Sequence, residues 1–205
     1  MTFVSTATTA GFTYTSPTLI AGDIVVLCVG GDRAEGVLVT PSGWNVAAAS
    51  LDMLIPAGGG DTGTAQTTSA VYWRRAAGTS LSASFGRNVR VQSVVLRSVT
   101  SLTGVEVRRV NASDFAYPAL TFDDPMTGHV VHVGIALRAY AYASGPAASG
   151  DTLRQSHLVA ASGVRNPSGA AVYRYTWLTA SEKAFTAATS VAAASAGQRV
   201  DGWAV

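Results

Sequence analysis

Residues 22–29 read Gly22-Asp23-Ile24-Val25-Val26-Leu27-Cys28-Val29, and this stretch decides the fold. A Gly-Asp pair is followed by six consecutive apolar residues, most of them β-branched. A short apolar run that begins at a turn is typical of a strand covered on both faces. Because Pro17 begins the preceding turn, we expect a central strand over Leu19–Val29.

A later part of the chain repeats this pattern. Gly128-His129-Val130-Val131 resembles the beginning of the first strand, and Ala70-Val71-Tyr72 recurs as Ala171-Val172-Tyr173. The two matches are separated by 106 and 101 residues, close enough to indicate one duplicated unit. We therefore predict pseudo-repeats at about residues 15–110 and 120–205, as complementary parts of a single domain over residues 1–205.

The rest of the chain alternates short strand-like segments with clusters of Gly, Pro, Ser and Asp. This spacing is typical of a sandwich or a jelly roll, and 205 residues suffice for the core of one such domain. We predict an all-β fold, namely a jelly-roll-like β-sandwich of two antiparallel sheets with an internal pseudo-duplication. Pro41-Ser42-Gly43-Trp44 predicts a tight turn that delivers Trp44 to the edge of the core, Asp123-Asp124-Pro125 predicts another turn, and Ala184–Ala196 predicts strand and loop rather than helix.

One strand of the second repeat shows a division of faces. Alternate positions are apolar and predict the core face: Val131, Val133, Ile135, Leu137, Ala139 and Ala141. We expect the opposite face to meet solvent or a neighbouring molecule; it carries His132, Arg138, Tyr140 and Tyr142. Arg and Tyr are enriched at interfaces, so Arg138, Tyr140 and Tyr142 are the predicted partner-binding residues. The Gly58–Gly63 loop and the Met1–Tyr14 segment are further candidate arms.

The composition narrows the classes of partner. Hydrophobic residues make up 48% of the chain, charged residues only 13%, and the net charge is +2, which excludes a disordered tail. The arginines are scattered, so no basic stripe indicates nucleic acid. No apolar run approaches membrane-spanning length, and residues 1–5 lack the features of a secretory leader. We expect a protein made in a cytosol without nucleic-acid or membrane partners, and Cys28 as a buried structural thiol.

No pattern predicts catalytic, cofactor-binding or metal-binding residues. His129 and His132 are three apart in a predicted strand, which places them on opposite faces, so they cannot share one ion. His157 has no nucleophile or carboxylate at a telling spacing. Asp123 and Asp124 could be paired general acid and base, but two acidic residues before a proline are more typical of a turn. We therefore expect a protein that is not an enzyme and has no cofactor.

A family resemblance is carried by stretches of the first repeat. They are Ala21-Gly22-Asp23-Ile24-Val25-Val26-Leu27, Thr40-Pro41-Ser42-Gly43-Trp44, Ala70-Val71-Tyr72-Trp73-Arg74 with Ala76-Ala77-Gly78, and Ser93-Val94-Val95-Leu96-Arg97-Ser98-Val99. In this order they resemble a β-sandwich family common among tailed-phage virion proteins. The chain departs from the family pattern at Ser98, where Gly is usual, and its second repeat lacks the Pro-x-Gly-Trp turn.

The resemblance implies a non-enzymatic virion structural protein, first of all a capsid decoration or cement protein or a head-fibre protein. Its partners would be major capsid or tail proteins, and homo-oligomers such as trimers are expected. It would be assembled into the virion in the cytoplasm of a bacterial host. The alternatives are a minor tail or baseplate protein, a carbohydrate-binding receptor-recognition module whose Tyr140 and Tyr142 stack on a host glycan, and a hydrolase of cell-surface glycans.

Overall fold

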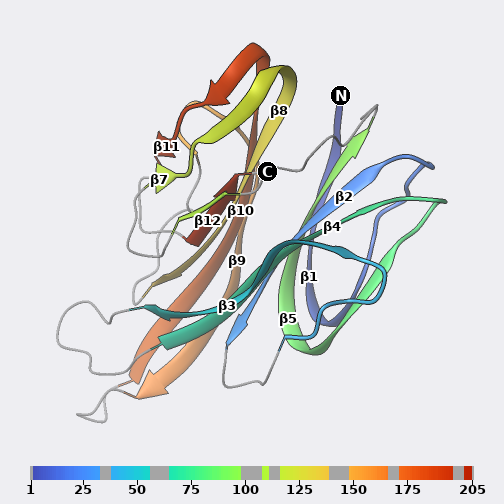
Figure 1. Cartoon of the computed structure of the whole chain (residues 1–205). Helices are drawn as coiled ribbons and strands as arrows, with labels where there is room; N and C mark the ends of the chain where they lie inside the picture. The colour runs from blue at the N-terminus through green and yellow to red at the C-terminus, as the bar shows by residue number, and fades with distance from the viewer. Residues whose placement is uncertain are drawn as a thin grey trace.

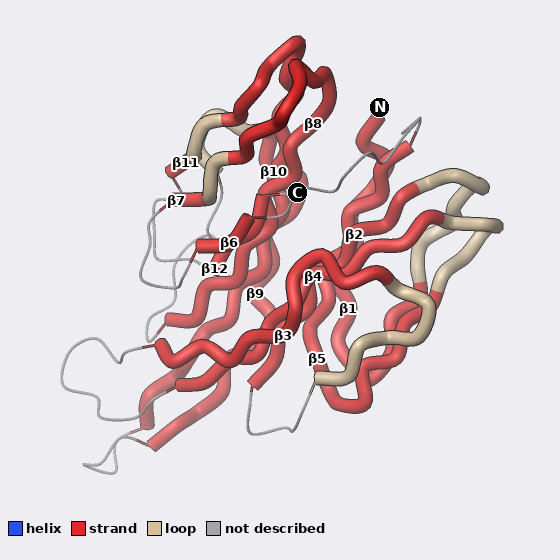
Figure 2. Tube along the Cα trace, viewed as in Figure 1, coloured by secondary structure: helices blue, strands red, loops and turns tan. Residues whose placement is uncertain are grey.

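The structure, a computed structural model, describes residues 2–32, 38–55, 65–97, 108–110, 116–138, 148–165, 171–195 and 201–204. Every regular element in these ranges is a β-strand (Figure 2), and every strand pair is antiparallel. The strands form two layers (Figure 1), and side chains from both pack in one apolar cluster. The predicted all-β sandwich of antiparallel sheets is confirmed.

Two five-stranded sheets make up the body of the molecule. Sheet A contains, in spatial order, β1 (Thr2–Thr15), β5 (Ser82–Arg97), β2 (Ile24–Asp32), β4 (Ala65–Arg75) and β3 (Asn45–Ile55). Sheet B contains β6 (Arg108–Val110), β12 (Asp201–Ala204), β8 (Leu120–Arg138), β10 (Ala171–Val191) and β9 (Thr152–Arg165). A two-stranded sheet pairs β7 (Ala116–Tyr117) with β11 (Ala194–Ser195).

The two large sheets have the same strand order. If the strands of each sheet are numbered along the chain, both sheets read 1-5-2-4-3. The repeated tripeptides lie in β4 and β10, which occupy the same place in this order. Their registers differ, however. Leu27 pairs with Tyr72, whereas Val133, the counterpart of Leu27 in the sequence match, pairs with Ala180, seven residues beyond Tyr173. The duplication of the sequence stays a prediction.

The strand order does not support the jelly-roll part of the prediction. Each large sheet is built from one contiguous half of the chain, from β1 to β5 and from β6 to β12. A jelly roll instead winds two Greek keys between its two sheets. The architecture is therefore a sandwich in which each half of the chain forms one sheet.

Strand β2 is buried on both of its faces, as the sequence predicted. Val25, Leu27 and Val29 belong to a core inside the curved sheet A, which also contains Tyr14, Trp44, Tyr72 and Phe85. The alternate residues Ile24, Val26 and Cys28 pack against Val131, Val133 and Ala180 of sheet B. The thiol of Cys28 is fully buried, in agreement with its predicted structural role.

The predicted turn at Pro41-Ser42-Gly43-Trp44 is confirmed. The backbone N–H of Trp44 donates to the carbonyl of Pro41 at 3.2 Å, and Gly43 has a φ of 74°. Glycine adopts this positive φ without a steric penalty, so the turn favours it here. The Trp44 side chain is 6% exposed, and its Nε1–H donates to the carbonyl of Ser82 at 2.9 Å.

Two other predictions about local structure are wrong. Asp123-Asp124-Pro125 is not a turn between strands but lies inside β8. The register with β10 passes from Met126–Ala188 to Thr121–Ser190, so residues 122–125 form a large bulge. A bulge tolerates proline because the ladder is already interrupted there. The Met1–Tyr14 segment is no detached arm either, because residues 2–15 pair with β5. The other candidate arm, the Gly58–Gly63 loop, lies outside the described residues.

The bulge in β8 has a clear structural consequence. Leu120 and Val130 belong to the same strand, yet they share one cluster with Val191. Strand β8 must therefore bend back between them, and Figure 1 shows this bend at the upper end of the β8–β10 pair.

The residues predicted as strand and loop, 184–196, are described up to Ser195. They form the end of β10 and the short strand β11.

An ion pair joins the beginning of β2 to the end of β5. Arg97 donates from Nε to Asp23 Oδ1 and from Nη2 to Asp23 Oδ2, both at 2.8 Å, and the backbone N–H of Ile20 donates to Oδ2 at 2.9 Å. The Asp23 side chain is fully buried. Hydrogen bonds from Arg97 hold the pKa of Asp23 below its usual range, although burial opposes them. The pair therefore stabilises the ionised carboxylate in the folded state.

We expect Asp23→Asn to lower the free energy of unfolding by about 2 kcal/mol, because the amide replaces a buried charged acceptor. Since the pKa is lowered on folding, this contribution is complete above the unfolded pKa, about 3.9, and is lost as the pH falls through the folded value. Urea unfolding at a series of pH values measures it. The exposed Asp124→Asn variant is the control and should change stability by less than about 0.5 kcal/mol. Equal effects of the two variants would contradict the prediction.

Candidate functional site

The predicted partner-binding residues lie at one end of β8. Arg138 is the last residue of the strand and pairs with Tyr175 of β10. The side chain of Arg138, and all of Tyr140 and Tyr142, lie outside the described part of the chain. Their role stays a prediction.

His132 does not lie where the sequence analysis expected it. The alternation of β8 predicts that this face is exposed, but the His132 side chain is 1% exposed. Tyr117 of β7 covers the histidine, with the two ring centroids 5.1 Å apart. A small third sheet therefore buries the outer face of sheet B at this point, which the apolar–polar alternation of β8 does not indicate.

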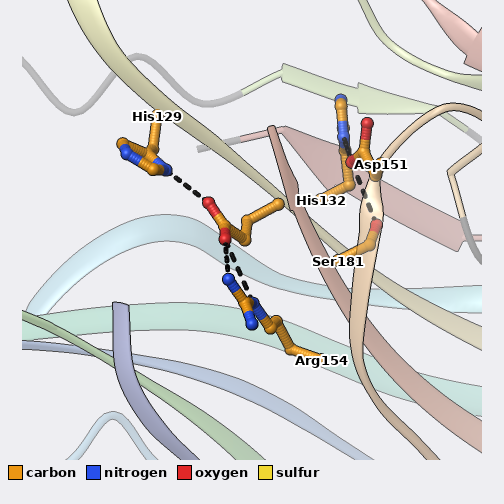
Figure 3. A network of polar contacts seen from close by, with 6 residues as sticks. His129, His132, Asp151, Arg154 and Ser181 are labelled. Atoms are coloured by element: carbon orange, nitrogen blue, oxygen red, sulfur yellow. Dashed lines mark hydrogen bonds and ion pairs between the residues drawn. The ribbon is translucent and has the colours of Figure 1, made fainter. Parts of the chain in front are cut away.

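The buried histidine belongs to a polar cluster with Asp151 and Ser181 (Figure 3). His132 Nδ1 lies 2.7 Å from Asp151 Oδ2, and the hydroxyl of Ser181 donates to the same oxygen at 3.1 Å. The Asp151 side chain is 1% exposed and Ser181 is 1% exposed. One carboxylate oxygen thus joins β8 and β10 to the turn before β9.

The turn that carries Asp151 is held independently by its backbone. The N–H of Asp151 donates to the carbonyl of Ala148 at 3.3 Å, and the N–H of Ser149 donates to the carbonyl of Ser195 in β11 at 2.7 Å. Gly150 has a φ of 85°, which favours glycine at this position. These contacts hold the turn that carries the carboxylate next to β11.

Tyr117 and Thr179 extend the buried cluster. Their hydroxyl oxygens lie 3.2 Å apart, and both residues are fully buried. Burial raises the pKa of Tyr117, and the nearby Asp151 carboxylate contributes in the same direction. The phenol is therefore neutral at physiological pH and acts as a hydrogen-bonding group.

The cluster contains the Ser, His and Asp of a hydrolytic triad, but the hydrogen bonds do not join them in the order that a triad has. In such a triad the histidine lies between the serine hydroxyl and the carboxylate. Here Asp151 lies between His132 and Ser181, and the serine proton points to the carboxylate. Among the described residues, His132 Nε2 and Asp151 Oδ1 have no hydrogen-bond partner. The arrangement positions strands and does not activate Ser181 as a nucleophile.

A second polar cluster contains His129, Arg154 and Glu182 (Figure 3). Arg154 Nε donates to Glu182 Oε1 at 3.0 Å, Arg154 Nη2 makes a further contact with this oxygen, and His129 Nδ1 contacts Oε2. The Glu182 side chain is 6% exposed. Burial acts to raise the pKa of Glu182, but the hydrogen bonds from Arg154 and His129 outweigh it and lower the pKa.

A β-bulge in β9 places Arg154 beside Glu182. Gln155 pairs with Ala180 and Leu153 pairs with Ser181, so Arg154 is the additional residue on β9. A bulge re-aims the side chain of the additional residue. The two histidines of β8 thus belong to different clusters, one with Asp151 and one with Glu182.

Sequence reasoning missed both clusters because their members are distant in the chain. His132 and Asp151 are separated by 19 residues, and His129 and Glu182 by 53. The only available signal was a polar residue interrupting an apolar strand at His132. Within the described ranges, no group of three or more His, Cys, Asp or Glu side chains could hold a metal ion, and no helix could span a membrane.

No family model, no curated protein and no solved structure matches this chain.

We expect Asp151→Ala to lower the free energy of unfolding by about 3 kcal/mol, because two buried donors lose their acceptor. Ser181→Ala removes only one donor and should cost about 1 kcal/mol. Thermal and urea unfolding measure both values. A fluorophosphonate probe, which labels activated serines, should leave Ser181 unmodified; labelling that is lost in Ser181→Ala would contradict the structural role.

The ion pair of the second cluster is tested by a double-mutant cycle of Arg154→Ala and Glu182→Gln. We expect the two residues to couple by about 1 kcal/mol, because Arg154 is partly exposed and water weakens the pair. Urea unfolding of the four proteins gives the coupling. A cycle of Lys183→Ala with Glu182→Gln is the control, since Lys183 is exposed and adjacent. Coupling of similar size in both cycles would refute the specific pair.

Proposed function

We propose that this chain is a non-enzymatic structural protein of a tailed-phage particle, acting as a capsid decoration, cement or head-fibre protein. It would dock onto the assembled particle and stabilise it by binding, because a ligand that binds only the assembled state shifts the equilibrium towards that state. The proposal rests on the family resemblance of the sequence, and the following observation supports it.

The motif residues that carry the resemblance serve as scaffold. Asp23 and Arg97 pair across the ends of β2 and β5, Gly43 lies in the turn that places Trp44 in the core, and Tyr72 is 1% exposed in the core of sheet A. These residues stabilise the sandwich through contacts within the chain. Proteins of one family that share these residues therefore share a structural scaffold. A structural component of a particle needs such a scaffold.

The surface also suits a protein that functions by being bound. Several large apolar side chains are exposed, among them Phe12 at 61%, Val39 at 52% and Leu153 at 48%. The carboxylates of Asp151 and Glu182 accept hydrogen bonds from side chains of the same chain. Apolar exposure with few charges is typical of the centre of a protein interface.

The proposal is tested on particles produced from the genome that encodes the chain. We expect mass spectrometry to detect the protein in purified virions, and particles from a deletion strain to lose their DNA at lower temperature. Purified protein added back should restore the wild-type temperature. Absence of the protein from mature virions would refute the virion role.

Labelling by electron microscopy separates the alternatives. Label on the capsid supports decoration, whereas label on the tail assigns the minor tail or baseplate alternative. The combined variant Arg138→Ala, Tyr140→Ala and Tyr142→Ala should weaken particle binding without changing thermal unfolding. Thr121→Ala with Thr189→Ala, two exposed positions at the other end of the β8–β10 pair, is the control. If the triple variant loses binding to a glycan array instead, the receptor-recognition alternative is favoured.

A further inference from the structure

Within the described ranges, the two large sheets have four edge strands, which differ in the features that prevent pairing with another molecule. The edges are β1 and β3 in sheet A, and β6 and β9 in sheet B. Proteins protect such edges with charged residues, prolines and bulges. Strand β6 carries two arginines, β9 carries Arg154 in a bulge as well as Arg165, and β3 carries Asp52 and two register shifts.

Strand β1 lacks the chemical protections. Its fourteen residues include no charged residue and no proline. Its pairing with β5 is unbroken from Ser5–Val95 to Gly11–Val89, between two register shifts. Edge strand β9 has a comparable run over residues 160–165, but it ends in Arg165. Residues 5–11 are therefore the longest uncharged regular edge in the described part of the molecule.

The sequence of residues 5–11 is compatible with pairing between the β1 edges of two copies of the chain. In an antiparallel pair, alternate residues point their N–H and C=O groups away from the existing partner, so β1 can accept another strand. A two-fold axis at Thr8 would place Ser5 opposite Gly11, Thr6 opposite Ala10 and Ala7 opposite Thr9 of the second copy. No pair brings together like charges or two bulky side chains, and threonines pair well across strands.

We propose that two copies of this chain associate through residues 5–11 of β1, which join sheet A of each copy into one continuous antiparallel sheet. A second copy is the favoured occupant because the segment is neutral and fits its own two-fold image, whereas the edges of β6 and β9 would bring arginine near arginine. The bulges after Phe3 and Gly11 limit the pairing to this segment. The exposed Phe12 lies at one of these limits and provides apolar area beside the new strand pair.

The neighbouring edge does not oppose this association. Strand β9 packs near β1 at the same side of the sandwich. Its bulged residue Arg154 is paired with Glu182 of the same chain, so this arginine would not meet a second copy as an uncompensated charge. The proposal does not rest on the virion role, because it concerns the purified chain alone.

A charge exchange at the two-fold axis tests the pairing. Sedimentation of the wild-type chain should show a species of twice 21.0 kDa. Thr8→Lys and Thr8→Glu should each weaken the dimer about tenfold, since like charges then face each other, and an equimolar mixture of the two should restore it. Thr79→Lys, at an exposed turn, is the control and should dimerise as the wild type does. A wild-type monomer up to millimolar concentration, or a dimer unaffected by both Thr8 variants, would overturn the proposal.

A crosslink gives a second measurement that does not depend on affinity. Residues directly opposite in an antiparallel pair lie within disulfide distance, so Thr8→Cys should form a disulfide-linked dimer under oxidation. Thr79→Cys should not, and the native Cys28 is buried. A linked dimer of Thr8→Cys that is absent from Thr79→Cys supports the pairing; equal linkage of the two overturns it. Failure of either test leaves particle binding, measured separately, unaffected.

Discussion

The burial of β2 on both faces is the constraint on which the rest of the structure depends. One set of its alternate side chains fills the core inside sheet A, and the other set contacts sheet B. A strand in this position can carry no polar side chain without a partner, which explains its apolar sequence. Asp23 directly precedes this strand, and its buried carboxylate is neutralised by the ion pair with Arg97.

Bulges in the strands of sheet B determine where several of its side chains lie. The bulge at residues 122–125 lets β8 bend back so that Leu120 reaches Val130, and the single bulged residue Arg154 reaches Glu182. The small β7–β11 sheet then covers His132. A regular alternating strand could not produce these contacts, because it would keep each side chain on its own face.

Features that depend on residues close together in the chain could be predicted from the sequence, whereas features that depend on residues far apart in the chain could not. Gly43 and Trp44 were predictable because a turn depends on four consecutive residues. The burial of Cys28 was predictable from the apolar run that contains it. The burial of His132 was not, since Tyr117 and Asp151 cover it from other elements. The turn predicted at Asp123 failed for the same reason, because pairing with β10 continues on both sides of the bulge.

The sequence by itself determined the all-β class, the central place of β2 and the turn at Trp44, because local apolar patterns and turn residues encode them. Only the tertiary structure decided that each half of the chain forms its own sheet, that His132 and Glu182 are enclosed by partners, and that β1 is an uncharged edge. These features depend on which distant strands pair and in which register. Strand pairing is a property of both partners, and a period of two along one strand does not specify it.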